Sequence, residues 1–405
     1  MRHPLPASLL CVLLCAPAAR ADDGRGLSRG GDPAQVSISG VSSGAAMAVQ
    51  YAVAHSASVT AVGSIAGPSW GCAEGSLARA VETCLCGGEP QGAQVEAARI
   101  EAARPLAEAK LIDPLTAGRP QRLARAYVFH SPADRTVRSP AGRVSARFLE
   151  NLTGRAVAFD DGDPADGSDA AGHGIITPGP GRDACRLEER GDDATATFVR
   201  SCGREDNVGH MFHALFGEEA AYDPERRAPD IPEADLWRFD QGRLVAQVTA
   251  ERPAIANDAA LVPFWPATAY STARRRNLDM AATGYLYVPP ACRPAGRGCR
   301  VHIALHGCRQ DPRHFALAAG YNNWAEPYRV IIVYPAIAPG TPLAGSACGS
   351  PIPDFLAYEP NPNGCWDWWG YLDSSYRTGR YLTRDAPQIR VIAGIVAAVT
   401  APAPP

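Results

Sequence analysis

Lysine is nearly absent from the sequence, and no cluster of basic residues takes its place. Lys110 is the only lysine, arginine is abundant, and the formal net charge is −3. Proteins bind nucleic acids and anionic membrane surfaces through basic patches, so neither partner is expected. Separately, we expect the protein to be a monomer. We attribute the scarcity of lysine to genomic base composition rather than to function.

Long apolar runs are also missing after the first residues, so no transmembrane helix is expected. The run at the start, "LPASLLCVLLCAPAA", is too short to cross a bilayer, follows Arg2 and His3, and leads into the small-x-small signal Ala19-Arg20-Ala21. These features predict a secretory signal peptide over residues 1–21, cut near Asp22. The mature protein is then secreted or periplasmic.

A zinc-binding CxxC motif or a Cys/His pairing at metal spacing is absent as well, and Cys84-Leu85-Cys86 does not replace it. Twelve cysteines minus two in the signal peptide leave an even number, which predicts disulfides in an exported chain. Cys72, Cys84 and Cys86 lie close together, so one of them must pair elsewhere, with Cys348 as a candidate. Proximity suggests two further pairs, Cys292 with Cys299 and Cys185 with Cys202.

Short apolar runs alternate with stretches that favour helix, such as the Ala-rich "GAAMAVQYAVAHS" after Ser43. This alternation predicts an α/β fold with a mostly parallel sheet and helices on both faces. The strands expected from these runs are "QVSIS" before Gly40, "VTAVGSIAG" at 59–67, "ARAYVFHS" at 124–131 and, later in the chain, "LWRFD", "TGYLYVP", "RVHIALHGC" and "YRVIIVYPA".

Three regions are expected to lack regular structure. Residues 155–184 are rich in Gly, Asp and Pro and predict a loop that carries His173. The polar segment at 218–234, "EEAAYDPERRAPDIPEA", is punctuated by proline and predicts a linker or a long surface connection. Residues 396–405, which end in "TAPAPP", are expected to form a flexible tail.

The first motif with chemical meaning is Gly40-Val41-Ser42-Ser43-Gly44, a Gly-x-Ser-x-Gly pattern between a predicted strand and a predicted helix. A nucleophilic serine in such a turn needs small residues two positions before and after it. Ser42 has glycines there, whereas Ser43 would have Val41 and Ala45. Ser42 is therefore the candidate nucleophile, and the Ser43 backbone N–H, at the helix N-terminus, is a candidate oxyanion donor.

A serine nucleophile needs a base that is oriented by an acid, and in hydrolases of this kind the chain order is Ser, acid, His. Asp134 in "HSPADRTV" follows a predicted strand, where the acid belongs, although a turn or helix-cap role is the alternative. His173 is flanked by a glycine on each side in a loop and suits the base. His210 and His213 fall in a predicted helix, where packing is more common, and His130 is too close in sequence to face the acid.

The second oxyanion donor is expected in a turn like "HGGG" after another strand, and "VHIALHGC", at 301–308, has this form. In an ordinary α/β-hydrolase this segment precedes the nucleophile in the chain. Here it follows Ser42, and most of the sequence lies between the two. A circular permutation explains the order, with the join of the old ends near 218–234. One catalytic domain over 22–395 then follows, rather than two.

The segment "NPNGCWDWWGY", at 361–371, holds three tryptophans in four residues, which is too many for one amphipathic face. We therefore expect some of them to be exposed. They either anchor the core beside a disulfide or form an apolar wall for a hydrophobic acyl or polymer substrate.

These motifs, together with "GYNNWAE", resemble the poly(3-hydroxybutyrate) depolymerase esterases of the single-domain type, which have a circularly permuted α/β-hydrolase fold. The run "YNNWAEPYRVIIVYP" followed by "PNGCWDW" is the most specific part. The likeness covers most of the mature chain and thins over 86–120 and 242–268, where this sequence carries extra residues.

The resemblance implies a role for each matching residue. Ser42 would be the nucleophile, Asp134 the acid and His173 the base. The backbone N–H groups of Ser43 and Cys308 would form the oxyanion hole. Cys308 would be disulfide-bonded to Cys365, and Trp366 would line the crevice for the polyester chain.

The sequence thus predicts an exported serine esterase that hydrolyses poly(3-hydroxybutyrate) or its oligomers and needs neither metal nor organic cofactor. An esterase for small or plant-wall esters, such as an acetyl or feruloyl esterase, is the alternative within enzymes. A non-catalytic polyester-binding protein is the alternative outside them, since tryptophan clusters adsorb to apolar surfaces.

Overall fold

A computed structural model describes residues 26–88, 93–116, 119–120, 122–186, 196–217, 221–251, 277–293, 298–340, 348, 361–372 and 379–402. The predicted signal peptide lies outside these ranges, as do residues 252–268 of the second segment with extra residues. Among the described helices, none is both long enough and apolar enough to cross a membrane.

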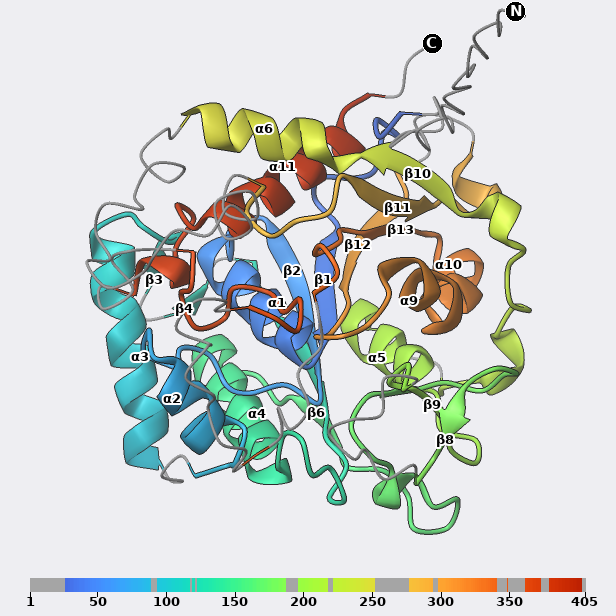
Figure 1. Cartoon of the computed structure of the whole chain (residues 1–405), viewed down its shortest axis with the longest axis horizontal. Coiled ribbons are helices and arrows are strands. Elements are labelled where there is room, and N and C mark those ends of the chain that lie inside the picture. Colours follow the sequence, from blue (N-terminus) through green and yellow to red (C-terminus); the bar gives the residue numbers. More distant parts are fainter. Residues whose placement is uncertain are drawn as a thin grey trace, which may run out of the picture.

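A sheet of eight strands forms the centre of the protein (Figure 1). Six of its strands are parallel to one another, and the two at one edge join by antiparallel pairing. Every strand expected from an apolar run is present. In spatial order the strands are β10 (Trp237–Asp240), β11 (Thr283–Tyr287), β13 (Val330–Tyr334), β12 (Arg300–Leu305), β1 (Val36–Val41), β2 (Val59–Ile65), β5 (Arg125–Phe129) and β6 (Ala158–Asp160).

The order of the strands is that of a circularly permuted α/β-hydrolase. Counted from β10 as the first strand and continuing through the chain ends to β6, the sheet reads 1-2-4-3-5-6-7-8. The described part of the linker, 221–236, connects the N-terminal half to the edge strand β10. The other ends are adjacent, because the Gly30 backbone N–H donates to the Ala401 carbonyl at 2.9 Å.

Helices cover both faces of the sheet, as expected, and each face has its own apolar core (Figure 1). On one face the core joins the sheet to α1, α4, α6 and α11, and on the other face it joins the sheet to α5, α9 and α10. Short helices and turns complete the described part. The bounds are α1 Ser43–Ala54, α2 Leu77–Arg79, α3 Ala93–Glu108, α4 Ser139–Thr153, α5 Asn207–Phe216, α6 Gln241–Glu251, α9 Pro312–Ala318, α10 Tyr321–Tyr328 and α11 Pro387–Thr400.

Two of the regions expected to be irregular contain regular structure. The region 155–184 holds β6 and two strands of a small parallel sheet with the order β7-β9-β8. The expectation of a flexible tail from residue 396 is wrong as far as Thr400, because α11 continues to that residue and buries Val399 completely. The small sheet consists of β7 (Ile175–Ile176), β9 (Val199–Ser201) and β8 (Asp183–Ala184), and a hairpin pairs β3 (Leu115–Thr116) with β4 (Arg119–Pro120).

Candidate active site

Ser42 lies at the junction of β1 and α1 in a backbone conformation that side chains rarely adopt. Its φ is 55° and its ψ is −118°, a strain that is typical of functional turns. The glycines on either side permit this turn. A Cβ atom on Gly40 would collide with the carbonyl group of Gly44, and one on Gly44 would collide with the carbonyl oxygens of Leu305 and His306. The steric argument for Ser42 as the turn residue is therefore met in the structure.

Asp134 and His173 are brought together directly. The loop after β5 carries Asp134, and its Oδ2 lies 2.8 Å from Nδ1 of His173. The other carboxylate oxygen, Oδ1, accepts the backbone N–H groups of Thr136 and Val137, each at 2.9 Å. Burial alone would raise the pKa of Asp134, but the charge and hydrogen bond of His173 outweigh it and lower that pKa. Asp134 is therefore an ionised acceptor that holds His173 by Nδ1.

His130, which we expected to be too close in sequence to face the acid, lies beside it. Its Nε2 is 3.5 Å from Oδ2 of Asp134 and 2.7 Å from the Val137 carbonyl oxygen. The loop after β5 turns back within four residues and brings His130 next to Asp134, a contact that the sequence spacing did not predict. Burial lowers the pKa of His130, so it is a neutral side chain that donates to Val137.

A small sheet and a buried arginine fix the backbone of His173, which precedes β7. Arg200 on β9 is completely buried, and its Nε donates to the His173 carbonyl oxygen at 2.7 Å. Its Nη1 donates to the Ala184 carbonyl oxygen on β8 at 3.0 Å. The disulfide Cys185–Cys202 closes the same sheet. The sequence analysis did not single out Arg200, because an arginine in a short strand does not reveal which carbonyl it will meet.

Two of the backbone N–H groups near Ser42 are those that the resemblance assigns to an oxyanion hole, and neither has an acceptor among the described residues. One belongs to Ser43, the first residue of α1, and the other to Cys308, in the loop after β12. Gly307 brings this loop against the nucleophile turn, since a Cβ atom on Gly307 would lie 3.2 Å from Cβ of Ser42. Donors that are not engaged within the described part of the protein and lie beside a strained serine are suited to a developing oxyanion.

Five disulfides are present among the described residues. The pairs suggested by proximity, Cys185–Cys202 and Cys292–Cys299, are formed, and so is the pair implied by resemblance, Cys308–Cys365. The pairing left open by the sequence is Cys72–Cys84, with Cys86 bonded to Cys348. Disulfides of this number are typical of proteins that reside in an oxidising compartment.

Trp366 does not line a crevice, contrary to expectation. It has no exposed surface; its Nε1 donates to the His306 carbonyl oxygen at 2.9 Å, and its backbone N–H donates to Oγ of Ser43 at 3.4 Å. Trp368 and Trp369 are also buried, so the expectation that some of the three are exposed is wrong. The tryptophan segment is a core anchor that ties the loop after β12 to the start of α1.

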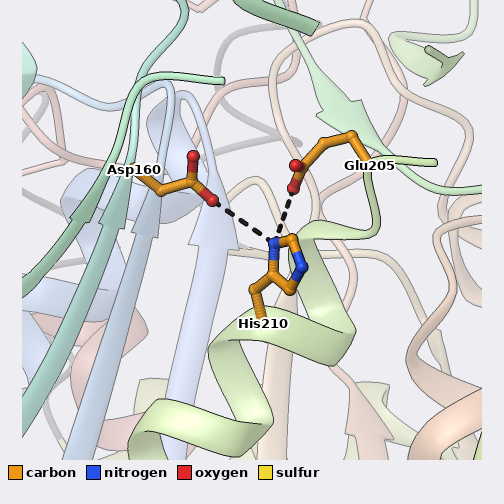
Figure 2. A group of neighbouring side chains, drawn as sticks. All are labelled: Asp160, Glu205 and His210. Carbon is orange, nitrogen blue, oxygen red and sulfur yellow. Dashed lines mark hydrogen bonds and ion pairs between the residues drawn. The ribbon is translucent and has the colours of Figure 1, made fainter. Parts of the chain in front are cut away.

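The helix α5 contains His210 and His213 as predicted, and His210 belongs to a second cluster of ionisable groups (Figure 2). Its Nδ1 lies 3.1 Å from Oε1 of Glu205 and 3.5 Å from Oδ2 of Asp160. Among the described residues, this trio could hold a metal ion, because its ligand atoms lie within 4.8 Å of one another. However, although burial lowers the pKa of His210, the two carboxylates raise it to about 10. Without a metal ion, His210 is thus an imidazolium at neutral pH, paired with Asp160 and Glu205, and the cluster ties β6 to α5.

Comparisons with known proteins agree with this fold. A serine-to-alanine variant of a PHB depolymerase, complexed with an R3HB trimer, superposes with a TM-score of 0.65 at 24% identity, covering 92% of this chain and 98% of that one. The crystal structure of the PHB depolymerase from Penicillium funiculosum gives the same score and identity, covering 93% and 98%. The chain shares the fold of the PHB depolymerases.

Curated sequences point the same way. The poly(3-hydroxybutyrate) depolymerase of Delftia acidovorans is 26% identical over 371 residues, which is 90% of this chain and 59% of that protein. The polyhydroxybutyrate depolymerase of Talaromyces funiculosus is 39% identical over 100 residues, or 24% and 27% of the two chains. This chain thus spans less than two thirds of the length of either relative. No protein-family model matches it.

Proposed function

We propose that the protein is an exported serine esterase that hydrolyses poly(3-hydroxybutyrate) or its oligomers through an acyl-enzyme. The observation that carries the proposal is the hydrogen bond between Asp134 and His173. Asp134 follows the C-terminal end of β5, and the strained Ser42 follows the C-terminal end of the parallel strand β1. The names of the similar proteins supply the substrate class. The disulfides favour export, and the signal peptide predicted at residues 1–21 would direct it.

In this mechanism Ser42 attacks an ester carbonyl while Nε2 of His173 removes its proton. Asp134 keeps the proton of Nδ1 in place and stabilises the imidazolium that forms. The N–H groups of Ser43 and Cys308 donate to the carbonyl oxygen as it becomes negative; in comparable sites each such donor contributes about 3 kcal/mol. His173 then protonates the leaving alkoxide oxygen, which departs as a hydroxyl, and a water molecule releases the acid from Ser42 by the same steps in reverse.

The proposal is tested with purified, fully oxidised protein on a polymer suspension, with release of 3-hydroxybutyrate as the readout. We expect the wild type to release acid, Ser42→Ala to release none, and the exposed-serine control Ser58→Ala to match the wild type. A fluorophosphonate should label the wild type and not Ser42→Ala. Absence of labelling would favour a binding protein, and faster turnover of acetyl or feruloyl esters than of hydroxybutyrate oligomers would favour the other esterases.

A further inference from the structure

Gln310 lies two residues beyond Cys308 and is buried, with 6% of its surface exposed. Its side-chain amide bridges two backbone groups from distant parts of the chain. Oε1 accepts the Gly307 N–H at 2.5 Å, and Nε2 donates to the Thr197 carbonyl oxygen at 2.9 Å. An N–H can only donate and a carbonyl oxygen can only accept, so the two partners fix the orientation of the amide without ambiguity.

The bridge engages one of the two amides that flank Cys308 in the loop after β12. Gln310 takes the N–H of Gly307, and the N–H of Arg309 donates to the Asn363 carbonyl oxygen at 2.8 Å. The Gly307 carbonyl oxygen is also engaged, by Nδ1 of His306 at 2.8 Å. Cys308 lies between these two bound amides, and its own N–H has no acceptor within the described ranges. The loop is thus held on both sides of the Cys308 amide.

The other end of the bridge reaches the surroundings of the base. Thr197 precedes Phe198, whose ring meets the edge of the His173 ring at a centroid distance of 6.0 Å. Phe198 has a left-handed φ of 57°, which is costly for an aromatic residue and needs support from its surroundings. A second contact runs in parallel, because the guanidinium of Arg309 lies 5.7 Å from the centre of the Phe198 ring.

From these contacts we propose that Gln310 is a positioning residue that sets the oxyanion loop against the segment beside the base. Its Oε1 holds the His306–Gly307 peptide and so positions the adjoining Gly307–Cys308 peptide, whose N–H would donate to the oxyanion. Its Nε2 ties that loop to the Thr197–Phe198 segment. This role rests on the proposed function, because it concerns the same serine esterase site.

The test compares Gln310→Met, which removes both bonds, with Gln310→Glu, which keeps an acceptor for Gly307 and loses the donor to Thr197. Gln241→Met is the matched control. Gln241 is a fully buried glutamine that likewise bridges backbone groups, from Ala336 N–H to the Ala281 carbonyl oxygen. Steady-state kcat and KM on a soluble short ester, inhibition by a boronic acid that mimics the tetrahedral intermediate, and Tm are measured for all variants.

A misplaced oxyanion donor weakens the transition state and leaves the bound substrate unchanged. We therefore expect Gln310→Met to lower kcat about 10- to 100-fold with KM within about twofold, and to weaken boronate inhibition in parallel. Gln310→Glu should lie between Gln310→Met and the wild type. Gln241→Met should lower Tm as Gln310→Met does while kcat stays within about threefold of the wild type.

Wild-type kcat and boronate affinity in Gln310→Met, or an equal loss of kcat in Gln241→Met, would overturn the role of Gln310 while leaving the esterase proposal intact. A wild-type protein that neither turns over esters nor reacts with a fluorophosphonate would overturn both.

Discussion

Replacing Asp134 with asparagine tests the centre of the proposed mechanism, because the structure dictates how the new amide must lie. Oδ1 of Asp134 accepts two backbone N–H groups, from Thr136 and Val137. In Asp134→Asn the amide oxygen has to keep that position, since an NH₂ group there would face two other donors and leave both unpaired, at about 1–3 kcal/mol each. The NH₂ group therefore points at His173.

His173 then has to accept at Nδ1, so its proton moves to Nε2, and it can no longer remove a proton from Ser42. A comparable substitution in a serine-protease triad lowers kcat about 10⁴-fold, and we expect a loss of this size here, equal to about 5 kcal/mol of transition-state stabilisation. The fold should be retained, because asparagine keeps the shape of the side chain.

The assay is kcat on a soluble nitrophenyl ester together with the rate of fluorophosphonate labelling, with near-UV circular dichroism to confirm the fold. Asp206→Asn is the matched control: Asp206 is a buried aspartate that bonds Trp324 and Arg227, so its loss should lower Tm and leave kcat within about threefold. The tautomer argument is refuted if Asp134→Asn keeps kcat within about tenfold of the wild type, or if both variants lose activity equally.

Two further substitutions test other parts of the structure. Gly44→Ala places a methyl group against the carbonyl oxygens of Leu305 and His306; because backbone atoms cannot move aside cheaply, we expect a loss of about 2–4 kcal/mol in urea unfolding and no fluorophosphonate labelling. Normal labelling would show that the turn tolerates a side chain. His210→Gln tests the ion-pair cluster. The pKa of His210 is raised to about 10, so the stability that it adds is complete below its unfolded pKa of about 6.5 and is lost as the pH rises toward 10. The free energy of unfolding of the wild type should exceed that of the variant by about 1–2 kcal/mol near pH 6, a value reduced by solvent screening at this partly exposed site. The difference should shrink by pH 10, and a difference that is constant with pH would contradict the role of the ion pairs.

Most strands of the sheet, and the order of the candidate site residues along the chain, could be predicted because both depend on local sequence patterns. Apolar runs of five to seven residues mark the buried strands β2 and β13, and the glycines of the Ser42 turn mark a close approach of backbone atoms. The strand β6 was not predicted, because it has only three residues, Ala158–Asp160, and none of them is fully buried. Chain order also suggested His173 as the partner of Asp134, and the structure places them within hydrogen-bonding distance.

The remaining features depend on contacts between segments that are distant in the sequence. The burial of Trp366 follows from its bond to His306, which spacing within "GCWDWW" does not reveal. The same is true of Arg200 and Gln310, whose partners are carbonyl groups set by the fold. Both residues can be seen in the sequence, but nothing in the neighbouring residues indicates that Arg200 and Gln310 are buried or which carbonyl groups they contact.

The position of β1 also has a consequence for how the protein is made. Among the described strands of this sheet, β1 comes first in the chain, yet it lies in the middle of the sheet and pairs with β2 on one side and β12 on the other. Until residue 305 has left the ribosome, one edge of β1 has no partner, and such edges invite aggregation. Sheets built from distant pairings also form slowly. The nascent chain therefore cannot bring the loop after β12 against the Ser42 turn until residues 300–308 are available to fold.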